Sequence, residues 1–271
     1  MASDFIGSLA KGLAVLQAFN RERPEMTVSE VAKAVDVTPA AARRCLLTLE
    51  ELGFVTRHER RFLLTPRVLR LSEAFLSSVS MQEVMQQFLQ EMVDATGDSA
   101  SVAVLDGTDV LYVASVSAKR SYQLTPTIGT RYPAYATSLG RAILSRSPSD
   151  LVDRVLGTTD FTQLTAKTVV DPELIRKAIR TASVTGIAGS DEQLTYGVVS
   201  VAMPLLDSSG NAVAAVNCST SPHRTSLKDM LETRRDVLAK ARSQITSALR
   251  QHPVLTHAVL GLDSSRAFLA D

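Results

Sequence analysis

The chain has 271 residues, of which 45% are hydrophobic and 21% are charged, and its formal net charge is +1. This composition excludes a chain that is disordered throughout, and the length is comfortable for two domains. Two cysteines, Cys45 and Cys218, stand far apart within apolar patterns, which argues for a reducing compartment and against a disulfide framework or a metal site. Because no stretch resembles a signal peptide or reaches the ~18 apolar residues of a membrane span, we expect a cytoplasmic protein that contacts no membrane.

Residues 1–67 predict a winged helix-turn-helix, which is a DNA-binding module. A first helix is expected to close its small core with Leu9, Leu13, Leu16 and Phe19. Thr27 and Glu30 have the spacing of a capping box at the start of a second helix. Only a few residues separate that helix from the next one, as in the tight turn of a helix-turn-helix.

The third helix is predicted between Thr38, its N-cap, and Gly53, its stop, with Pro39 in the first position. Its buried stripe is expected to consist of Ala42, Cys45, Leu46, Leu49 and Leu52. The remaining surface starts with small residues, which let a backbone approach a DNA groove, and continues with arginines for phosphates or guanine edges. The predicted DNA contacts are Thr38, Ala40, Ala41, Arg43, Arg44 and Thr48. The alternative is an ordinary three-helix subdomain whose arginines are solvated.

Residues 54–65 predict two short strands that fold back at residues 58–60 and form the wing of the module. Positions 57 to 70 hold five arginines against one acidic residue, Glu59. A basic cluster of this kind is typical of a surface that binds phosphates. We expect Arg60 and Arg61 to contact phosphates beside the bases that the third helix reads.

Residues 68–80 predict a linker helix. The helix after it has an apolar stripe of Met81, Val84, Met85, Phe88, Leu89, Met92 and Val93, and it stops at Gly97. Such a helix either begins the core of a second domain or forms a dimer seam, and we favour the core.

Residues 81–250 predict a second domain of mixed α/β structure. Strands are expected at 99–105, 110–116, 121–127, 198–205 and 212–218, with tight turns at 106–109 and 207–211. Helices are expected from about Thr137, over 172–183 and over 227–249, the last with Leu231, Leu238, Ala241, Ile245 and Leu249 on one face. Antiparallel strands flanked by helices give an α+β fold with the layers of a sensor domain. Residues 251–271 have no strong pattern and are treated as a tail.

Two long motifs accompany the winged helix: Gly-x-Arg-Tyr-Pro-Ala-Tyr-Ala-Thr-Ser-Leu-Gly-Arg-Ala-Ile-Leu from Gly129, and Gly-x3-Ser-Asp-Glu-x4-Gly-Val-x2-Val-Ala-x-Pro from Gly186. Together these features resemble the IclR family of bacterial transcription regulators. The resemblance implies an N-terminal DNA-binding domain and a C-terminal, GAF-like effector-binding domain. The run Ala-Ala-Arg-Arg-x-Leu at 41–46 is similar to the PobR/PcaU/PcaR-type subgroup, whose effectors are p-hydroxybenzoate, protocatechuate or β-ketoadipate and which favours activation of a catabolic operon. Gln193 and Leu206 depart from the family pattern, which has a glutamate and an aromatic residue there.

A carboxylate is the ligand that the residues themselves indicate. The predicted helix start at Thr137 and Ser138 offers hydroxyls and backbone N–H groups, and Arg131 could add a charged contact. The resemblance implies that Ser190, Ser200, Asn217 and Ser219 line the polar side of the pocket and that Leu124 and Leu139 form its apolar wall. Aromatic stacking or phenol contacts are open to Tyr122, Tyr132 and Tyr135, each of which is as easily a core residue.

Two other functions are alternatives to a ligand-responsive regulator. A hydrolase could use Ser138 as its nucleophile, but no strand runs straight into it, no oxyanion loop precedes it and His223 is the only histidine in the patterned region of the domain. A second domain that merely dimerises the DNA reader is the other alternative. We expect no catalysis, cofactor or metal, and the partners that we expect are operator DNA, a small aromatic carboxylate and a second copy of the chain, as a homodimer or a dimer of dimers on an inverted repeat.

Overall fold

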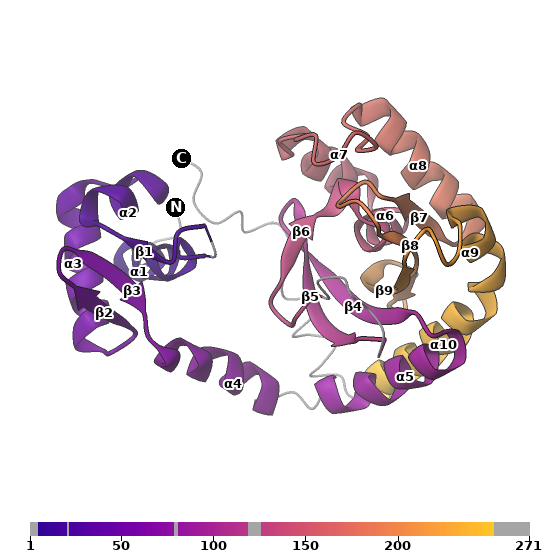
Figure 1. Ribbon diagram of the computed structural model, residues 1–271, viewed down its shortest axis with the longest axis horizontal. Coiled ribbons are helices and arrows are strands. Elements are labelled where there is room, and N and C mark those ends of the chain that lie inside the picture. Colours follow the sequence, from indigo (N-terminus) through magenta and orange to yellow (C-terminus); the bar gives the residue numbers. More distant parts are fainter. Residues whose placement is uncertain (1–4, 21, 79–80, 119–125, 252–271) are drawn as a thin grey trace. The chain divides into compact units, whose positions relative to one another are not determined.

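The structure is a computed structural model that describes residues 5–20, 22–78, 81–118 and 126–251 (Figure 1). The chain divides into two compact units, one that extends to Ser78 and one that begins at Val79. Most of the segment predicted as a linker helix therefore groups with the N-terminal unit. The predicted tail and most of the predicted strand 121–127 lie outside the described residues.

The N-terminal unit is a winged helix-turn-helix. Its helices are α1 (Gly7–Gln17), α2 (Val28–Ala34) and α3 (Pro39–Glu51). Its antiparallel sheet has the order β1 (Glu25–Met26), β3 (Arg61–Leu64), β2 (Val55–His58), and the 3-10 helix η1 (Pro66–Val68) and helix α4 (Leu69–Ser78) follow it. Strand β1 is not predicted, because two residues are too few to leave an alternating pattern.

Hydrogen bonds confirm the predicted starts of α2 and α3. The Thr27 N–H donates to Glu30 Oε2 at 2.7 Å, and the Glu30 N–H donates back to Thr27 Oγ1 at 3.3 Å. Thr38 Oγ1 accepts from the Ala41 N–H at 3.2 Å. After α3 the chain turns at Gly53, whose φ of 77° lies in the left-handed region that favours glycine.

The core of the N-terminal unit differs from the prediction along α1. Leu16 is buried as predicted, but Leu9 and Leu13 are 61% and 39% exposed. Ala10 and Val15 are buried in their place. The prediction for Leu9 and Leu13 is wrong because the side of α1 that faces the core includes a small alanine, which an argument from large apolar residues passes over.

The second unit is built on a six-stranded antiparallel sheet (Figure 1). Its strand order is β6 (Arg131–Pro133), β5 (Asp109–Val116), β4 (Ser99–Asp106), β9 (Ala212–Thr220), β8 (Val199–Leu206), β7 (Ala188–Asp191). The two predicted hairpins, β4–β5 and β8–β9, are confirmed. The short edge strands β6 and β7 are not predicted, because they have three and four residues and little alternation.

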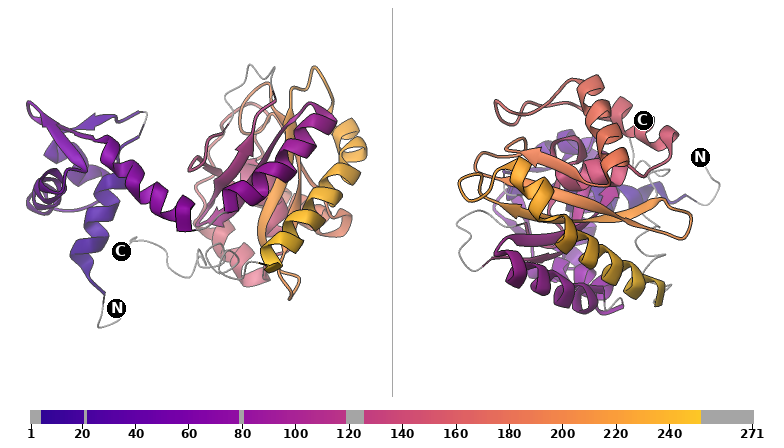
Figure 2. Two further views of the ribbon diagram at one scale, coloured as in Figure 1. Left: turned by 90° about the horizontal axis from the view of Figure 1, so that it is seen from below. Right: turned by 90° about the vertical axis from the view of Figure 1, so that its right-hand side faces the viewer.

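Helices cover both faces of this sheet (Figure 2). One face packs against α5 (Met81–Thr96), α9 (Leu227–Thr233) and α10 (Arg235–Gln251), and the other packs against η2 (Ala134–Ala136), α6 (Ser138–Leu144), α7 (Ser149–Thr158) and α8 (Pro172–Thr185). Met85, Leu89 and Met92 of α5 are buried in the first core, which confirms that this helix contributes to the core of the domain.

The single long helix predicted over 227–249 is wrong. The segment forms two helices that meet at Arg234, whose Nε donates to Asp98 Oδ2 at 2.7 Å. Asp98 is buried directly before β4, so this ion pair ties the helix junction to the sheet. A tertiary contact of this kind leaves no trace in the local apolar spacing.

Candidate functional site

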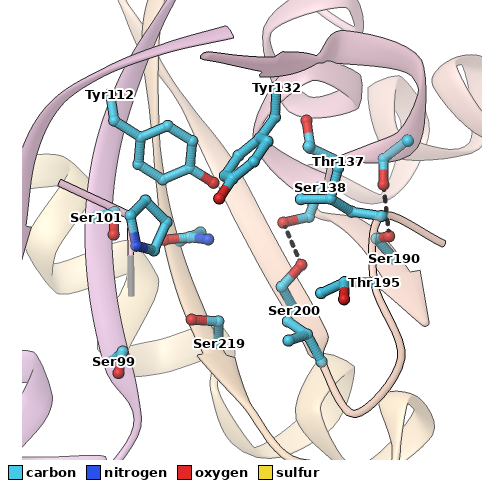
Figure 3. A pocket seen from close by; sticks show the side chains of 15 residues that line it. Ser99, Ser101, Tyr112, Tyr132, Thr137, Ser138, Ser190, Thr195, Ser200 and Ser219 are labelled. Carbon is cyan, nitrogen blue, oxygen red and sulfur yellow. Dashed lines mark hydrogen bonds between the residues drawn. The ribbon is translucent and has the colours of Figure 1, made fainter. Parts of the chain in front are cut away.

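A row of polar side chains crosses the face of the sheet that α6 covers (Figure 3). Along β4 and β9, alternate residues such as Val102 and Val216 point into the α5–α10 core. The residues between them point the other way. The strand registers pair Ser99 with Ser219, Ser101 with Asn217, Ser200 with Ser219 and Ser190 with Ser200. Four neighbouring strands thus place hydroxyl and amide groups together beneath the start of α6.

These groups line a cavity of about 70 Å³, measured as the space open to the centres of water molecules. That space holds roughly five waters, because one water needs about 10–15 Å³ by this measure. A single ring with one or two substituents displaces a comparable volume. The lining consists of Ser99, Ser101, Tyr112, Pro126, Tyr132, Ala136, Thr137, Ser138, Ser190, Leu194, Thr195, Val198, Ser200, Asn217 and Ser219.

Hydroxyl groups fix the start of α6 above the cavity. Thr137 Oγ1 caps the helix by accepting from the Gly140 N–H at 3.0 Å. The hydroxyl oxygens of Ser138 and Ser200 are 2.8 Å apart, and Ser190 Oγ donates to the Ala136 carbonyl at 2.9 Å (Figure 3). Gly140 permits this arrangement, because any side chain there would collide with the backbone of Ala134.

Asn217 brings an unused acceptor to the cavity. The residue is 4% exposed, and its Oδ1 has no hydrogen-bond partner among the described residues. Leaving a buried polar atom unpaired is unfavourable by about 1–3 kcal/mol, so an arrangement like this is most readily explained by a ligand or water that donates to it.

Two tyrosines form one wall. The rings of Tyr112 and Tyr132 meet edge to face with centroids 5.7 Å apart, and both hydroxyls point into the cavity (Figure 3). Burial raises the pKa of Tyr112 well above its usual value, and the neighbouring Tyr132 raises it further. Tyr112 is therefore a neutral phenol that can donate or accept a hydrogen bond.

Six of the predicted effector contacts meet at this cavity: Thr137, Ser138, Ser190, Ser200, Asn217 and Ser219. Three others are placed elsewhere. Arg131 is exposed and pairs with Asp106 and with Asp109, whose Oδ2 lies 3.2 Å from its Nε, so it does not reach the lining. Tyr135 donates to the Thr162 carbonyl at 2.5 Å, and Leu139 is fully buried in the core under α6.

Leu124 and Tyr122 fall outside the described residues. The sequence reasoning missed Ser99, Ser101 and Tyr112. Ser99 and Ser101 carried a signal, since two serines spaced two apart on an apolar strand mark a polar strip on one face. Tyr112 carried none, because an aromatic residue in a strand is ordinarily part of the core.

The exposed face of α3 is the candidate DNA interface. Arg43 and Arg44 are exposed and form no ion pair within the described part of the chain, and Ala40 beside them is exposed as well. The two arginines point about 100° apart. Arg44 lines the groove between α1 and α3 together with Ala41 and Thr48, whereas Arg43 does not.

The wing has fewer available arginines than its sequence indicates. Arg61 pairs with Glu25 at 2.9 Å and with Glu30 at 3.2 Å. Arg67 donates to the Leu52 carbonyl at the end of α3, at 2.5 Å. These contacts are internal to the unit and compete with phosphate binding. Arg60, next to the tight turn of the wing, is exposed and has no ion pair in the described residues.

An apolar groove of about 750 Å³ lies between α1 and α3. Its exposed lining residues include Leu9, Leu13, Leu52 and Leu71, which are 61%, 39%, 51% and 50% exposed. The predicted burial of Leu52 is therefore wrong: this residue caps α3 at the edge of the groove rather than inside the core.

Neither a metal-binding group of three or more His, Cys, Asp or Glu side chains nor a helix able to cross a membrane occurs in the described portion of the chain.

Most of the chain matches the two domains of one protein family. The IclR helix-turn-helix domain matches residues 8–59, and the C-terminal domain of the bacterial transcriptional regulator IclR matches residues 73–246. The chain is 36% identical over 228 residues to the Pca regulon regulatory protein of Pseudomonas putida, a match that covers 84% of this chain and 78% of that protein. It is 33% identical over 226 residues to the p-hydroxybenzoate hydroxylase transcriptional activator of Acinetobacter baylyi, covering 82% and 83%.

Two solved structures share the fold. A transcriptional regulator from Rhodococcus sp. RHA1 superimposes with a TM-score of 0.74 at 42% identity, over 91% of this chain and 99% of that one. An IclR homologue from Microbacterium hydrocarbonoxydans, solved in complex with 4-hydroxybenzoate, gives a TM-score of 0.72 at 21% identity over 90% and 99%. Since these relatives regulate transcription, the hydrolase alternative built on Ser138 is set aside. The domains matched and the identity to curated regulators lead to one conclusion: the chain belongs to the IclR family of bacterial transcriptional regulators.

Proposed function

We propose that this regulator controls an operon for aromatic-acid catabolism and that its effector is a small hydroxylated aromatic carboxylate bound in the cavity under α6. The observation that carries the proposal is the unpartnered Oδ1 of buried Asn217 in a cavity of single-ring size. The names of the two curated relatives support the aromatic class, since one belongs to a Pca regulon and the other activates p-hydroxybenzoate hydroxylase.

The ligand is oriented by neutral hydrogen-bonding groups. Asn217 Oδ1 accepts from a ring hydroxyl, because an amide oxygen can pair only with a donor. The carboxylate accepts from the hydroxyl of Ser138 at the other side of the cavity. It also accepts from the hydroxyl of Thr137, which exchanges its 3.3 Å hydrogen bond to the Ala134 carbonyl for the ligand. The ring packs against Tyr112 and Tyr132, which meet edge to face in the cavity wall.

The N-terminal unit binds operator DNA through the exposed face of α3. Ala40 and Ala41 allow close approach, one of Arg43 and Arg44 reads a base, and the other contacts phosphate. Arg60 is the wing residue that reaches a flanking phosphate, because Arg61 is engaged with Glu25 and Glu30.

The form that binds the operator is a homodimer. One winged helix contacts too few base pairs for high specificity, and two-fold symmetry doubles the site as an inverted repeat. The exposed leucines of the groove between α1 and α3, which are Leu9, Leu13, Leu52 and Leu71, pack against the same leucines of a second copy. Ala41, Arg44 and Thr48 on the α3 side of the groove stay free for DNA. The dimer acts in the cytoplasm, where the operator lies, and two dimers can assemble further.

The effector acts by binding the two states of the regulator with different affinity. Titration calorimetry with 4-hydroxybenzoate, protocatechuate, phthalate and β-ketoadipate, followed by operator binding with and without the best ligand, tests the proposal. The expected result is saturable binding of at least one aromatic acid that changes operator affinity. Binding of amines or sugars alone contradicts the aromatic class, and a protein that binds none of these compounds while dimerising normally favours a second domain that only dimerises.

A further inference from the structure

A buried cation that has no acidic partner among the described residues is hydrogen-bonded next to the cavity wall. Arg141, in α6, is 4% exposed. Its Nε donates to the Tyr135 carbonyl at 2.9 Å, its Nη1 donates to the Gly189 carbonyl at 3.1 Å, and its Nη2 donates to Gln193 Oε1. All three acceptors are neutral, so each nitrogen of the guanidinium has an acceptor while no described acid compensates the positive charge.

The charge lies close to the ligand space. Each of the three acceptors is the immediate sequence neighbour of a residue that lines the cavity, namely Ala136, Ser190 and Leu194. The hydrogen bond from Ser190 Oγ to the Ala136 carbonyl joins two of these residues directly. The guanidinium is therefore hydrogen-bonded to three residues whose chain neighbours form the cavity wall.

No other described charge competes with it there. The described lining contains no Asp, Glu, Lys, Arg or His. The two acids nearest in sequence to Gln193 are Asp191 and Glu192, and both pair with Lys167, at 3.3 and 2.5 Å. Burial alone lowers the pKa of Arg141 to about 10, with no contribution from a nearby acid, so the side chain stays charged at neutral pH.

We infer that Arg141 makes the cavity select anions over neutral molecules of the same shape, with the effector's carboxylate as its missing counter-ion. The residue acts through the wall and does not touch the ligand. A buried charge interacts strongly over several ångströms, because the protein interior screens it less than water does. Gln193 sets the strength of the effect, since a carboxylate in its place would neutralise the guanidinium. The choice of an aromatic probe rests on the proposed function, whereas the preference of the cavity for a negatively charged ligand does not.

The test compares 4-hydroxybenzoate with 4-hydroxybenzamide, which keeps the ring and hydroxyl but is neutral, by calorimetry and thermal shift on the full chain. Gln193→Glu is expected to lower the ratio of acid to amide affinity about tenfold. Gln193→Met, which removes the hydrogen bond without adding charge, is expected to keep the wild-type ratio. Gln87→Glu, on the exposed side of α5, controls for the added negative charge and is also expected to keep it.

Each outcome separates the inference from the proposed function. A wild type that binds acid and amide equally, or a folded Gln193→Glu protein with an unchanged ratio, overturns the inference and leaves the aromatic effector in place. A third outcome is that neither aromatic probe binds, that butyrate binds more tightly than butyramide, and that Gln193→Glu lowers this acid-to-amide affinity ratio. That outcome contradicts the aromatic class of effector and supports the inference about Arg141. If no carboxylate binds, both fall. Should Gln193→Glu fail to fold, Arg141→Gln must lower the ratio equally for the inference to survive.

Discussion

The hydroxyl oxygens of Ser138 and Ser200 lie 2.8 Å apart and join the first turn of α6 to strand β8. Both residues are buried and line the cavity under α6. Ser200→Ala is expected to reduce the free energy of unfolding by about 1–3 kcal/mol, because it leaves the Ser138 hydroxyl without this bond. It should also weaken effector binding by loosening the helix start. Urea denaturation measures the first effect and calorimetry the second, with Ser208→Ala in the exposed β8–β9 turn as the control. Equal stability of the two variants would show that the bond contributes nothing.

A substitution at Asn217 is expected to weaken effector binding without lowering stability, unlike Ser200→Ala. Its unpaired Oδ1 is unfavourable in the ligand-free protein, so Asn217→Leu is expected to leave the melting temperature unchanged or to raise it. The same change removes the acceptor for the ring hydroxyl, and the thermal shift caused by 4-hydroxybenzoate should be lost. Operator affinity without ligand should stay near wild type. A variant that melts earlier yet still responds fully to the ligand would place the effector elsewhere.

The arginines of α3 separate base reading from phosphate binding. Alanine at the base reader, Arg43 or Arg44, should reduce operator affinity by about 1–3 kcal/mol and relax specificity at one base pair. Alanine at the other arginine should weaken binding to all DNA sequences alike. It should also reduce the slope of log affinity against log salt concentration by about one. Binding titrations at several salt concentrations distinguish the two patterns. If neither change alters operator affinity, α3 is not the recognition helix.

The wing supplies a matched pair of substitutions. Arg60→Ala should lower affinity for any DNA sequence, because Arg60 is exposed and unpaired in the described residues. Arg61→Ala should have the smaller effect on DNA binding, since Arg61 already holds Glu25 and Glu30. The reverse order in a salt-dependent titration would mean that Arg61 exchanges its acidic partners for phosphate.

The apolar groove predicts the oligomeric state. Leu13→Glu places a charge in the groove at a side chain that is 39% exposed, so the N-terminal unit should still fold. Light scattering is expected to show weaker self-association. Gel-shift experiments are expected to show a loss of cooperative binding to the inverted repeat. Lys11→Glu, which changes charge at the same groove outside its apolar part, serves as the comparison. An unchanged dimer in Leu13→Glu would assign self-association to the second unit alone.

The two cysteines should differ in reactivity. Burial raises the pKa of Cys218 to about 12, with a further increase from the negative charge of Asp98. The native state therefore keeps this proton at pH values where the unfolded thiol, with a pKa near ~8.5, loses it. The stability contributed by the neutral thiol should be present below pH ~8.5 and decline as the pH rises from there toward 12. Alkylation at pH 8 is expected to label half-buried Cys45 and to reach Cys218 only after unfolding. Rapid labelling of native Cys218 would contradict its burial.

Much of the fold follows from local sequence. Thr27 with Glu30, and Thr38 with Pro39, mark helix starts because their side chains and ring geometry satisfy the first turn without help from other segments. The β4–β5 and β8–β9 hairpins are equally local, since both strands and the turn lie within one short stretch. By contrast, the single helix predicted over 227–249 is interrupted at Arg234, which contacts Asp98 far away in the sequence.

The sequence by itself determined the winged helix-turn-helix, the sensor-like second domain and most polar residues of the cavity under α6, through short-range patterns and long family motifs. Only the tertiary structure decided which charges are available. In the structure, Arg131 and Arg61 pair with acidic residues of other strands. Arg141 donates to neutral acceptors only, among the described residues. The physical reason is that the charge state and accessibility of a side chain depend on what surrounds it in space. For these three arginines the surroundings come from residues 22 to 52 positions away as well as from near neighbours.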